Sequence, residues 1–236
     1  MEEKQKLNLL SLAVDSASDF GEAKAYASFI CGFKEPFETR TPSDEEEGRK
    51  HEYIEPIIED GVYIVENGFL PRRFEDFAGV QNPKECDVMV SYHGHKWIVA
   101  KEDIGDDKLP LLSKDAHPED TSSFYMCEID ALNEFDMKSC TEHLRKAGIA
   151  FELDADLYIP TAGQLAAMFL YREELNEALK LVRGTPMKED VYWSSSEGNA
   201  WYSWGVNFDS GYVSGWSNEY NRYYVRPCRT FELKRK

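Results

Sequence analysis

The sequence predicts an α+β protein, because three different patterns follow one another along the chain. Short runs of β-branched and aromatic residues begin near residue 61, and two helical patterns occupy residues 135–186. A tail that is rich in aromatic residues and broken by glycines starts at residue 191. Strands repeat every two residues and helices about every 3.6, so these patterns separate strand regions from helical ones. With 236 residues, 42% of them hydrophobic, the chain is long enough to bury a core.

The first 57 residues differ from the rest of the chain. Residues 7–30 carry apolar side chains at helical spacing, and Gly21 divides them into two short helices. Residues 38–60 then hold nine acidic and three basic side chains, which remain solvated because like charges repel. We therefore expect a helical segment and an acidic linker over residues 1–57, which would attach the protein to a larger assembly, and one folded domain over residues 58–236.

The first strands are predicted from β-branched and aromatic runs at residues 62–65, 88–90 and 97–100. His93 and Gly94 stand between the last two runs, where a short turn would join the strands of a hairpin.

Two helical patterns follow these strands. The first is one apolar stripe that ends at Gly148, a residue type favoured at helix C-termini, and its members are Phe135, Met137, Cys140, Leu144 and Ala147. The second begins directly after Pro160, where Thr161 and Gln164 form the sequence pattern of a capping box. It continues or forms again up to Val182, and a glycine and a proline close it.

Residues 192–229 have the most unusual composition of the chain. Four of the five tryptophans and six of the thirteen tyrosines lie here, separated mostly by serine, asparagine and glycine. Rigid rings provide contact area at low entropic cost and small polar residues adapt their hydrogen bonds, as in antibody binding loops. Four glycines divide the tail from residue 191 onward into pieces too short for helices. The tail therefore predicts strands and loops that form a recognition surface.

Five motifs in the second half of the chain resemble one known family. They are YIPTAGQL at 158–165, YWSSSE at 192–197, AW at 200–201, FDSG at 208–211 and YVRPCR at 224–229. In this order and spacing they are similar to the C-type-lectin-fold proteins related to formylglycine-generating enzymes. That group is common in gut Bacteroidetes, Bacteroides among them, and in their phages, and it includes variable proteins diversified by retroelements. The likeness covers about residues 158–231, with a weaker one over residues 88–103.

The resemblance implies a C-type-lectin-like fold, in which two helices lie beside small antiparallel sheets and the last strand pairs with an early one. The irregular segment before that strand would form a loop-rich binding face, where diversified relatives vary. Trp216 and Glu219 depart from the residue types that adenine substitution produces there, so either they are fixed or this chain is not diversified. The match and the tail composition together predict the ligand-binding residues Asn199, Tyr202, Ser203, Trp204, Asn207, Asp209, Ser210, Tyr212, Ser214, Trp216, Asn218, Tyr220, Asn221 and Tyr223.

Other residues of the tail are expected to support this surface. Trp193, Trp201 and Phe208 stand within the motifs and are assigned to the core, because large rings in such positions are usually buried. Arg226 and Arg229 are expected to brace loops through carboxylates such as Glu197 or Asp209, using the forked guanidinium.

The sequence does not contain the sets of residues that catalytic, metal or cofactor sites of the family's kinds would need. An oxidase of the formylglycine-generating type needs a reactive cysteine pair, and only Cys228 lies in the tail, where it would act as a small hydrophobe. An iron site needs a histidine cluster, whereas His51, His117 and His143 are isolated in the sequence. The pair His93 and His95 has metal spacing but no obvious third ligand, and the acidic motifs of a calcium site are missing. We expect no catalytic residue, no metal and no cofactor.

Charge and hydropathy exclude two classes of partner. The formal charge is −17, which disfavours nucleic acids and anionic membranes because phosphate binding needs a basic face. No apolar run reaches the length of a membrane span, and the charged start does not resemble a signal peptide. Five cysteines without close spacing fit a reducing compartment. The sequence thus predicts a cytoplasmic or virion-associated location.

The sequence leaves three functions open. The first is a non-enzymatic recognition protein that presents the tail to a protein or glycan. The second is a structural virion or surface-assembly component whose aromatic face mediates self-association. The third, an oxidase of the formylglycine-generating type, has the least support from the residues.

Overall fold

The computed structural model describes residues 58–66, 71–74, 85–116, 125, 127–218 and 220–232. They belong to one compact unit, Pro56–Lys236. The helices and acidic linker predicted over residues 1–57 lie outside the described residues, so the proposed domain boundary stays a prediction.

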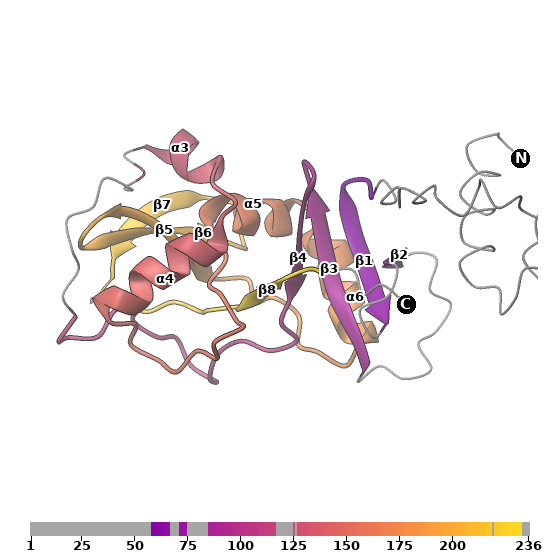
Figure 1. The fold of residues 1–236 in the computed structure, drawn as a ribbon, viewed down its shortest axis with the longest axis horizontal. Coiled ribbons are helices and arrows are strands. Elements are labelled where there is room, and N and C mark those ends of the chain that lie inside the picture. The colour runs from indigo at the N-terminus through magenta and orange to yellow at the C-terminus, as the bar shows by residue number, and fades with distance from the viewer. Residues whose placement is uncertain are drawn as a thin grey trace, which may run out of the picture. The chain divides into compact units, whose positions relative to one another are not determined.

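The α+β class is confirmed, with small antiparallel sheets and short helices (Figure 1). The elements in chain order are β1 (Gly61–Glu66), β2 (Arg72–Arg73), β3 (Cys86–Tyr92), β4 (His95–Val99), α3 (Glu128–Leu132), α4 (Met137–Ala147), α5 (Ala162–Leu170), α6 (Arg172–Leu181), β5 (Val191–Asn199), β6 (Tyr202–Asn207), β7 (Val213–Ser217) and β8 (Cys228–Thr230).

The strands form two separate antiparallel sheets. One has the order β2-β1-β3-β4-β8 and the other has the order β5-β6-β7. The final strand, β8, pairs with β4 through Trp97 opposite Thr230 and Val99 opposite Cys228. A strand from the end of the chain therefore completes the sheet that the early strands begin, as the sequence analysis predicted.

The predicted hairpin turn is confirmed at His93 and Gly94. Tyr92 pairs directly with His95, so these two residues form the whole connection between β3 and β4. Both have positive φ, 49° for His93 and 84° for Gly94, which matches a two-residue turn with the twist that hairpins favour. His93 stacks on Tyr92, and the ring of His95 stacks on Phe135 of the next segment.

The end of α4 and the start of α5 lie at predicted signals. The start of α4 was not predicted, and the second helical pattern forms two helices, α5 and α6. Asp136 caps α4 by accepting a hydrogen bond from the backbone N–H of Ser139 at 3.0 Å, and Gly148 ends the helix with φ of 116°. Thr161 and Gln164 form both bonds of the capping box at the start of α5. The structure also contains α3 and β2, which the sequence analysis missed because five and two residues are too short for a periodic pattern.

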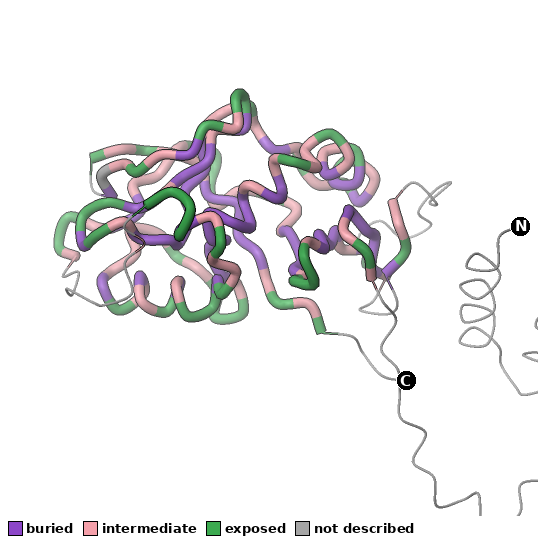
Figure 2. The backbone as a smooth tube through the Cα atoms, turned by 90° about the horizontal axis from the view of Figure 1, so that it is seen from above, coloured by how far each residue is buried: buried purple, intermediate pink, exposed green. Residues whose placement is uncertain are grey.

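Two hydrophobic clusters meet at β5, because consecutive strand residues point to opposite faces of a sheet. Tyr192 belongs to the larger cluster, which β1, β3, β4, α5 and α6 share. Trp193, the next residue, belongs to the second, with Leu112, Leu144 and Ile159 among its members. In Figure 2 the buried residues are purple and lie mostly in the inner segments of the tube, and the exposed residues are green. Strand β5 is therefore packed on both faces and is a fixed support for β6 and β7.

Replacing Gly163 with alanine is expected to destabilise the domain by about 1–3 kcal/mol, because overpacking forces the backbone to shift. A Cβ at Gly163 would lie 2.5 Å from the carbonyl oxygen of Leu132 and 2.7 Å from that of Glu134. A Cβ at Gly215, in contrast, meets no atom within 4 Å. Urea denaturation of Gly163→Ala and Gly215→Ala tests this, and equal stability of the two variants would contradict the packing described here.

Candidate recognition surface

The β5-β6-β7 sheet has two ends, and the predicted surface residues are divided between them. Tyr202 is paired with Ser217 at one end of β6, and Val206 is paired with Val213 at the other. The β5–β6 turn therefore projects from one end and the β6–β7 turn from the opposite end. With about 3.3 Å per strand residue, roughly 16 Å separates Tyr202 from Asn207 along β6.

The predicted residues differ widely in exposure. Six are exposed: Asn199, Tyr202, Asp209, Ser210, Tyr212 and Tyr220. Six are partly buried: Trp204, Asn207, Ser214, Trp216, Asn221 and Tyr223. Ser203 and Asn218 are buried, so their assignment to the exposed binding face was wrong. Ser203 lies inside the paired length of β6, and the backbone of Asn218 bonds to Leu111, Leu112 and Trp201.

Three rings predicted at the surface pack against the hydrophobic clusters instead: Trp204 against the larger one, and Trp216 and Tyr223 against the second. Trp216 and Tyr223 make an edge contact with centroids 5.2 Å apart, and Tyr223 makes another with Trp193 at 4.9 Å. Trp204 donates from its indole N–H to the carbonyl oxygen of Tyr125 at 3.0 Å. A buried indole N–H usually finds such a partner, so this hydrogen bond holds Trp204, while edge contacts hold the other two rings.

Trp201 differs from its prediction in the opposite sense, because it is exposed where burial was expected. It was assigned to the core, but 55% of its surface is exposed. Trp201 stands in the turn between β5 and β6, and its N–H binds the side-chain oxygen of Asn199 at 2.9 Å. The turn directs the ring away from both clusters, whereas Trp193 and Phe208 are buried as predicted.

We call Trp201, Tyr202 and Tyr220 the tip patch, because they lie at the same end of the three-stranded sheet. The backbone N–H of Asn218 binds the carbonyl oxygen of Trp201 at 2.9 Å, which places the chain leading to Tyr220 beside the β5–β6 turn. The three side chains are 55%, 47% and 81% exposed. Tyr212, at the opposite end, is 63% exposed and does not belong to this patch.

The segment that carries Tyr220 is fixed by hydrogen bonds to distant parts of the chain. Leu109 and Tyr223 exchange both backbone hydrogen bonds, at 2.8 and 3.0 Å. The N–H of Trp193 binds the carbonyl oxygen of Tyr224, and the N–H of Ile104 binds that of Val225, both at 2.9 Å. The residues between β7 and β8 are thus tied to β5 and to the loop that precedes α3.

Arg226 ends this segment as a fully buried ion pair. Its Nε donates to Asp103 at 2.6 Å, and its Nη1 donates to the carbonyl oxygens of Ala100, Lys101 and Thr185. Arg229 pairs with Asp87. Arg226 braces loops as predicted, whereas Arg229 of β8 joins a strand, β3, through Asp87. The predicted partners, Glu197 and Asp209, were wrong, because the C-terminal strand approaches the early sheet rather than the tail.

Glu197 pairs instead with His143, which the sequence analysis treated as isolated. Burial raises the pKa of the Glu197 carboxyl group, and the contact with His143 opposes that shift.

Among the residues that the structure describes, no three histidine, cysteine or acidic side chains gather as a metal site, and no helix is long and apolar enough to cross a membrane. Cys228 is buried, as expected of a small hydrophobe.

The described fold and site define an α+β domain with a fixed three-stranded sheet that carries exposed rings at its end. No family model matches the sequence, and no curated protein matches it. Among solved structures, a fimbrial protein from Bacteroides ovatus is similar at 19% identity with a TM-score of 0.42. The match covers 57% of this chain and 35% of the fimbrial protein.

Proposed function

We propose that the protein is a non-enzymatic recognition protein that binds a protein or glycan through the tip patch. The observation that carries this proposal is the exposure of three large rings on a hydrogen-bonded scaffold. Tryptophan and tyrosine are among the residues most often found as binding hot spots, so exposed rings at one end of a sheet are candidate contact residues.

The rigidity of the tip supports recognition by a preformed surface. The β5–β6 turn is closed by Asn199, and the Tyr220 segment is tied to the sheet through Asn218 and Tyr223. Little backbone entropy is therefore lost when a ligand docks, which leaves more of the contact energy for affinity. Exposed Asn199 and partly buried Asn221 provide polar groups that tune specificity around the rings.

We further propose that the domain is a C-type-lectin-like member of the formylglycine-generating-enzyme-related group. The pairing of β8 with β4 and the burial of the YWSSSE motif in β5 support this assignment. If the chain is diversified by a retroelement, we expect variation at exposed positions such as Tyr202 and Tyr220. Buried Ser203 and Asn218 should then be constant, because substitutions there would disturb the scaffold.

Replacing the whole tip patch is expected to weaken binding strongly without unfolding the protein. The test compares wild type with the triple variant Trp201→Ser/Tyr202→Ser/Tyr220→Ser on a glycan array and an array of purified cell-surface proteins. Loss of three ring anchors should weaken binding by roughly 100-fold or more, since single hot spots contribute about 2 kcal/mol or more. Leu170→Ser/Tyr212→Ser is the control, because it removes exposed apolar side chains outside the patch.

Two outcomes of that comparison decide against the proposal. If the triple variant binds as well as wild type, the tip patch is not the recognition surface. If light scattering shows a wild-type oligomer that the triple variant dissociates, the patch mediates self-association and the assembly role is the better description.

A further inference from the structure

One apolar side chain outside the tip patch is more exposed than Trp201 or Tyr202. Ile129 of α3 is 70% exposed, whereas Ala131, two positions further along the same helix, is fully buried. Residues two positions apart point to opposite sides of a helix, so α3 packs through Ala131 and turns Ile129 outward. A single exposed aliphatic side chain is ordinary, so the importance of Ile129 depends on what lies beside it.

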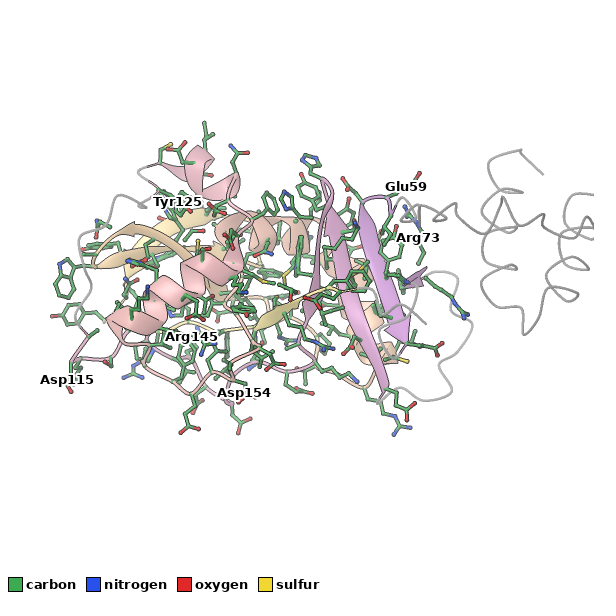
Figure 3. The ribbon with its side chains drawn as sticks, viewed as in Figure 1. Glu59, Arg73, Asp115, Tyr125, Arg145 and Asp154 are labelled. Atoms are coloured by element: carbon green, nitrogen blue, oxygen red, sulfur yellow. The ribbon has the colours of Figure 1, made fainter. Side chains whose placement is uncertain are left out.

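The segment that leads into α3 lies against the end of the three-stranded sheet that carries the tip patch. The N–H of Tyr125 binds the carbonyl oxygen of Glu197 at 2.8 Å, and the indole of Trp204 donates to the carbonyl oxygen of Tyr125 at 3.0 Å. Tyr125 is labelled directly below α3 in Figure 3, and α3 itself contacts β5. Tyr202 stands two positions before Trp204 on β6, so both rings project from the same face of the sheet. The exposed ring of Tyr202 and helix α3 therefore lie on the same side.

Ile129 and the tip patch are close enough for one partner to contact both. Ile129 stands four positions after Tyr125, and a chain spans at most about 3.6 Å per residue, so their Cα atoms lie within about 14 Å. Tyr125 is itself bonded to the strands that carry the tip patch. A standard interface buries about 800 Å² on each partner, which corresponds to a patch roughly 30 Å across. An interface centred on the rings of the tip patch can therefore include Ile129.

The polar side chains at this end of the sheet are mostly committed to the fold. Ser203 and Asn218 are buried. The side-chain oxygen of Asn199 accepts from the N–H of Trp201, and the side-chain nitrogen of Asn221 donates to a neighbouring tyrosine hydroxyl. A sugar presents many hydroxyls, and each one that is desolvated without a partner weakens binding. Rings and an aliphatic side chain with few available polar groups fit the apolar contact residues of a protein better.

Helix α3 is acidic, and this indicates the charge of the partner. Glu128 and Asp130, on either side of Ile129, are both exposed, and the helix contains no basic residue. Arg222, two positions after Tyr220, is exposed and has the opposite charge, so the acidic rim of the surface is its α3 side. The whole chain carries a formal charge of −17, which attracts a basic partner over a long range. Lysine or arginine at the border of that partner's contact surface would complement α3.

We propose that the tip patch and Ile129 form one contact surface for a protein whose apolar contact residues are bordered by lysine and arginine on the α3 side. This inference rests on the function proposed for the tip patch, and it names the partner as a basic protein surface rather than a glycan.

The array of purified cell-surface proteins and the glycan array test this inference, because the composition of every molecule on them is known. We expect the binders to be proteins, and their binding should weaken as salt is raised, since salt screens exposed charges. Ile129→Ser should weaken binding to such a protein by roughly tenfold, because an apolar contact is lost from the interface. Leu170→Ser is the matched control, because Leu170 is an aliphatic residue with a comparable exposure of 62% outside this surface.

A charge reversal tests the acidic rim separately. Glu128→Lys/Asp130→Lys should lower the association rate with the same protein by roughly tenfold at low salt, and should reduce the salt dependence of that rate. Glu173→Lys/Glu177→Lys changes the net charge by the same amount at exposed positions of α6, so it should have a clearly smaller effect. Thermal denaturation checks that each variant is folded.

The outcomes separate this inference from the function proposed for the tip patch. Binding that the tip-patch triple variant weakens, but that Ile129→Ser and the α3 charge reversal leave unchanged, overturns the inference and leaves the proposed function standing. Binding to glycans alone has the same meaning. A triple variant that binds as well as wild type contradicts the proposed function itself.

Discussion

Replacing Arg226 with methionine is expected to lower the free energy of unfolding by about 3–5 kcal/mol, the usual cost of removing one partner from a buried ion pair. Arg226 is fully buried, and its partner Asp103 is 5% exposed at the side chain. The substitution removes the shortest contact of the Asp103 carboxylate, which keeps only Lys188 at 3.7 Å and the Tyr192 hydroxyl at 3.3 Å. It also removes donors from the carbonyl oxygens of Ala100, Lys101 and Thr185. Methionine keeps most of the side-chain volume, so the loss of stability measures mainly the contribution of the polar network.

Arg229 provides the matched control for this substitution. It stands three residues further along the chain and pairs with Asp87, but its side chain is 41% exposed. An exposed pair contributes about 0–1 kcal/mol, so Arg229→Met should change stability little. Urea denaturation measures both variants, and a smaller loss for Arg226→Met than for Arg229→Met would show that the buried network does not hold the C-terminal segment.

Replacing Trp193 with alanine is expected to cost about 3–5 kcal/mol of stability, the range for deleting a large buried ring. Trp193 is fully buried in the cluster shared with Leu144 and Ile159, and its indole N–H donates to the carbonyl oxygen of Leu109 at 2.8 Å. Deleting it creates a cavity under β5 and leaves that carbonyl without its indole donor. The support beneath Tyr223 is removed as well, because the two rings are in edge contact.

Trp201→Ala is the corresponding control within the same stretch of sequence. Trp201 is 55% exposed in a turn, and surface substitutions away from special features usually change stability by about 0.5 kcal/mol or less. Thermal and urea denaturation of the two variants should therefore differ clearly. A large loss for Trp201→Ala would place this ring in the core and remove it from the tip patch.

The elements that depend on local signals were predicted well from the sequence. The capping box at Thr161, the glycine at the end of α4 and the turn at His93 act within a few residues, so their pattern is visible in a single chain. The burial of Trp193 and Phe208 also followed from their motifs. The class of the fold follows from the order of such local patterns.

The candidate site was harder to predict, because its contacts join residues that are far apart in the sequence. Asp103 and Arg226 are separated by 123 positions, and His143 and Glu197 by 54. Composition alone does not distinguish Trp193 from Trp201, which differ only in whether they stand in a strand or in a turn. The division of the predicted surface between two sheet ends likewise depends on the register of β6 with β7.

The most direct test of the recognition surface is iodide quenching of Trp201 with and without a ligand found on the arrays. Subtracting the signal of Trp201→Phe from that of wild type isolates the emission of this residue. We predict that Trp201 is readily quenched in the free protein and becomes protected when the ligand binds. Quenching of Trp201 that stays the same in the bound state would contradict the account.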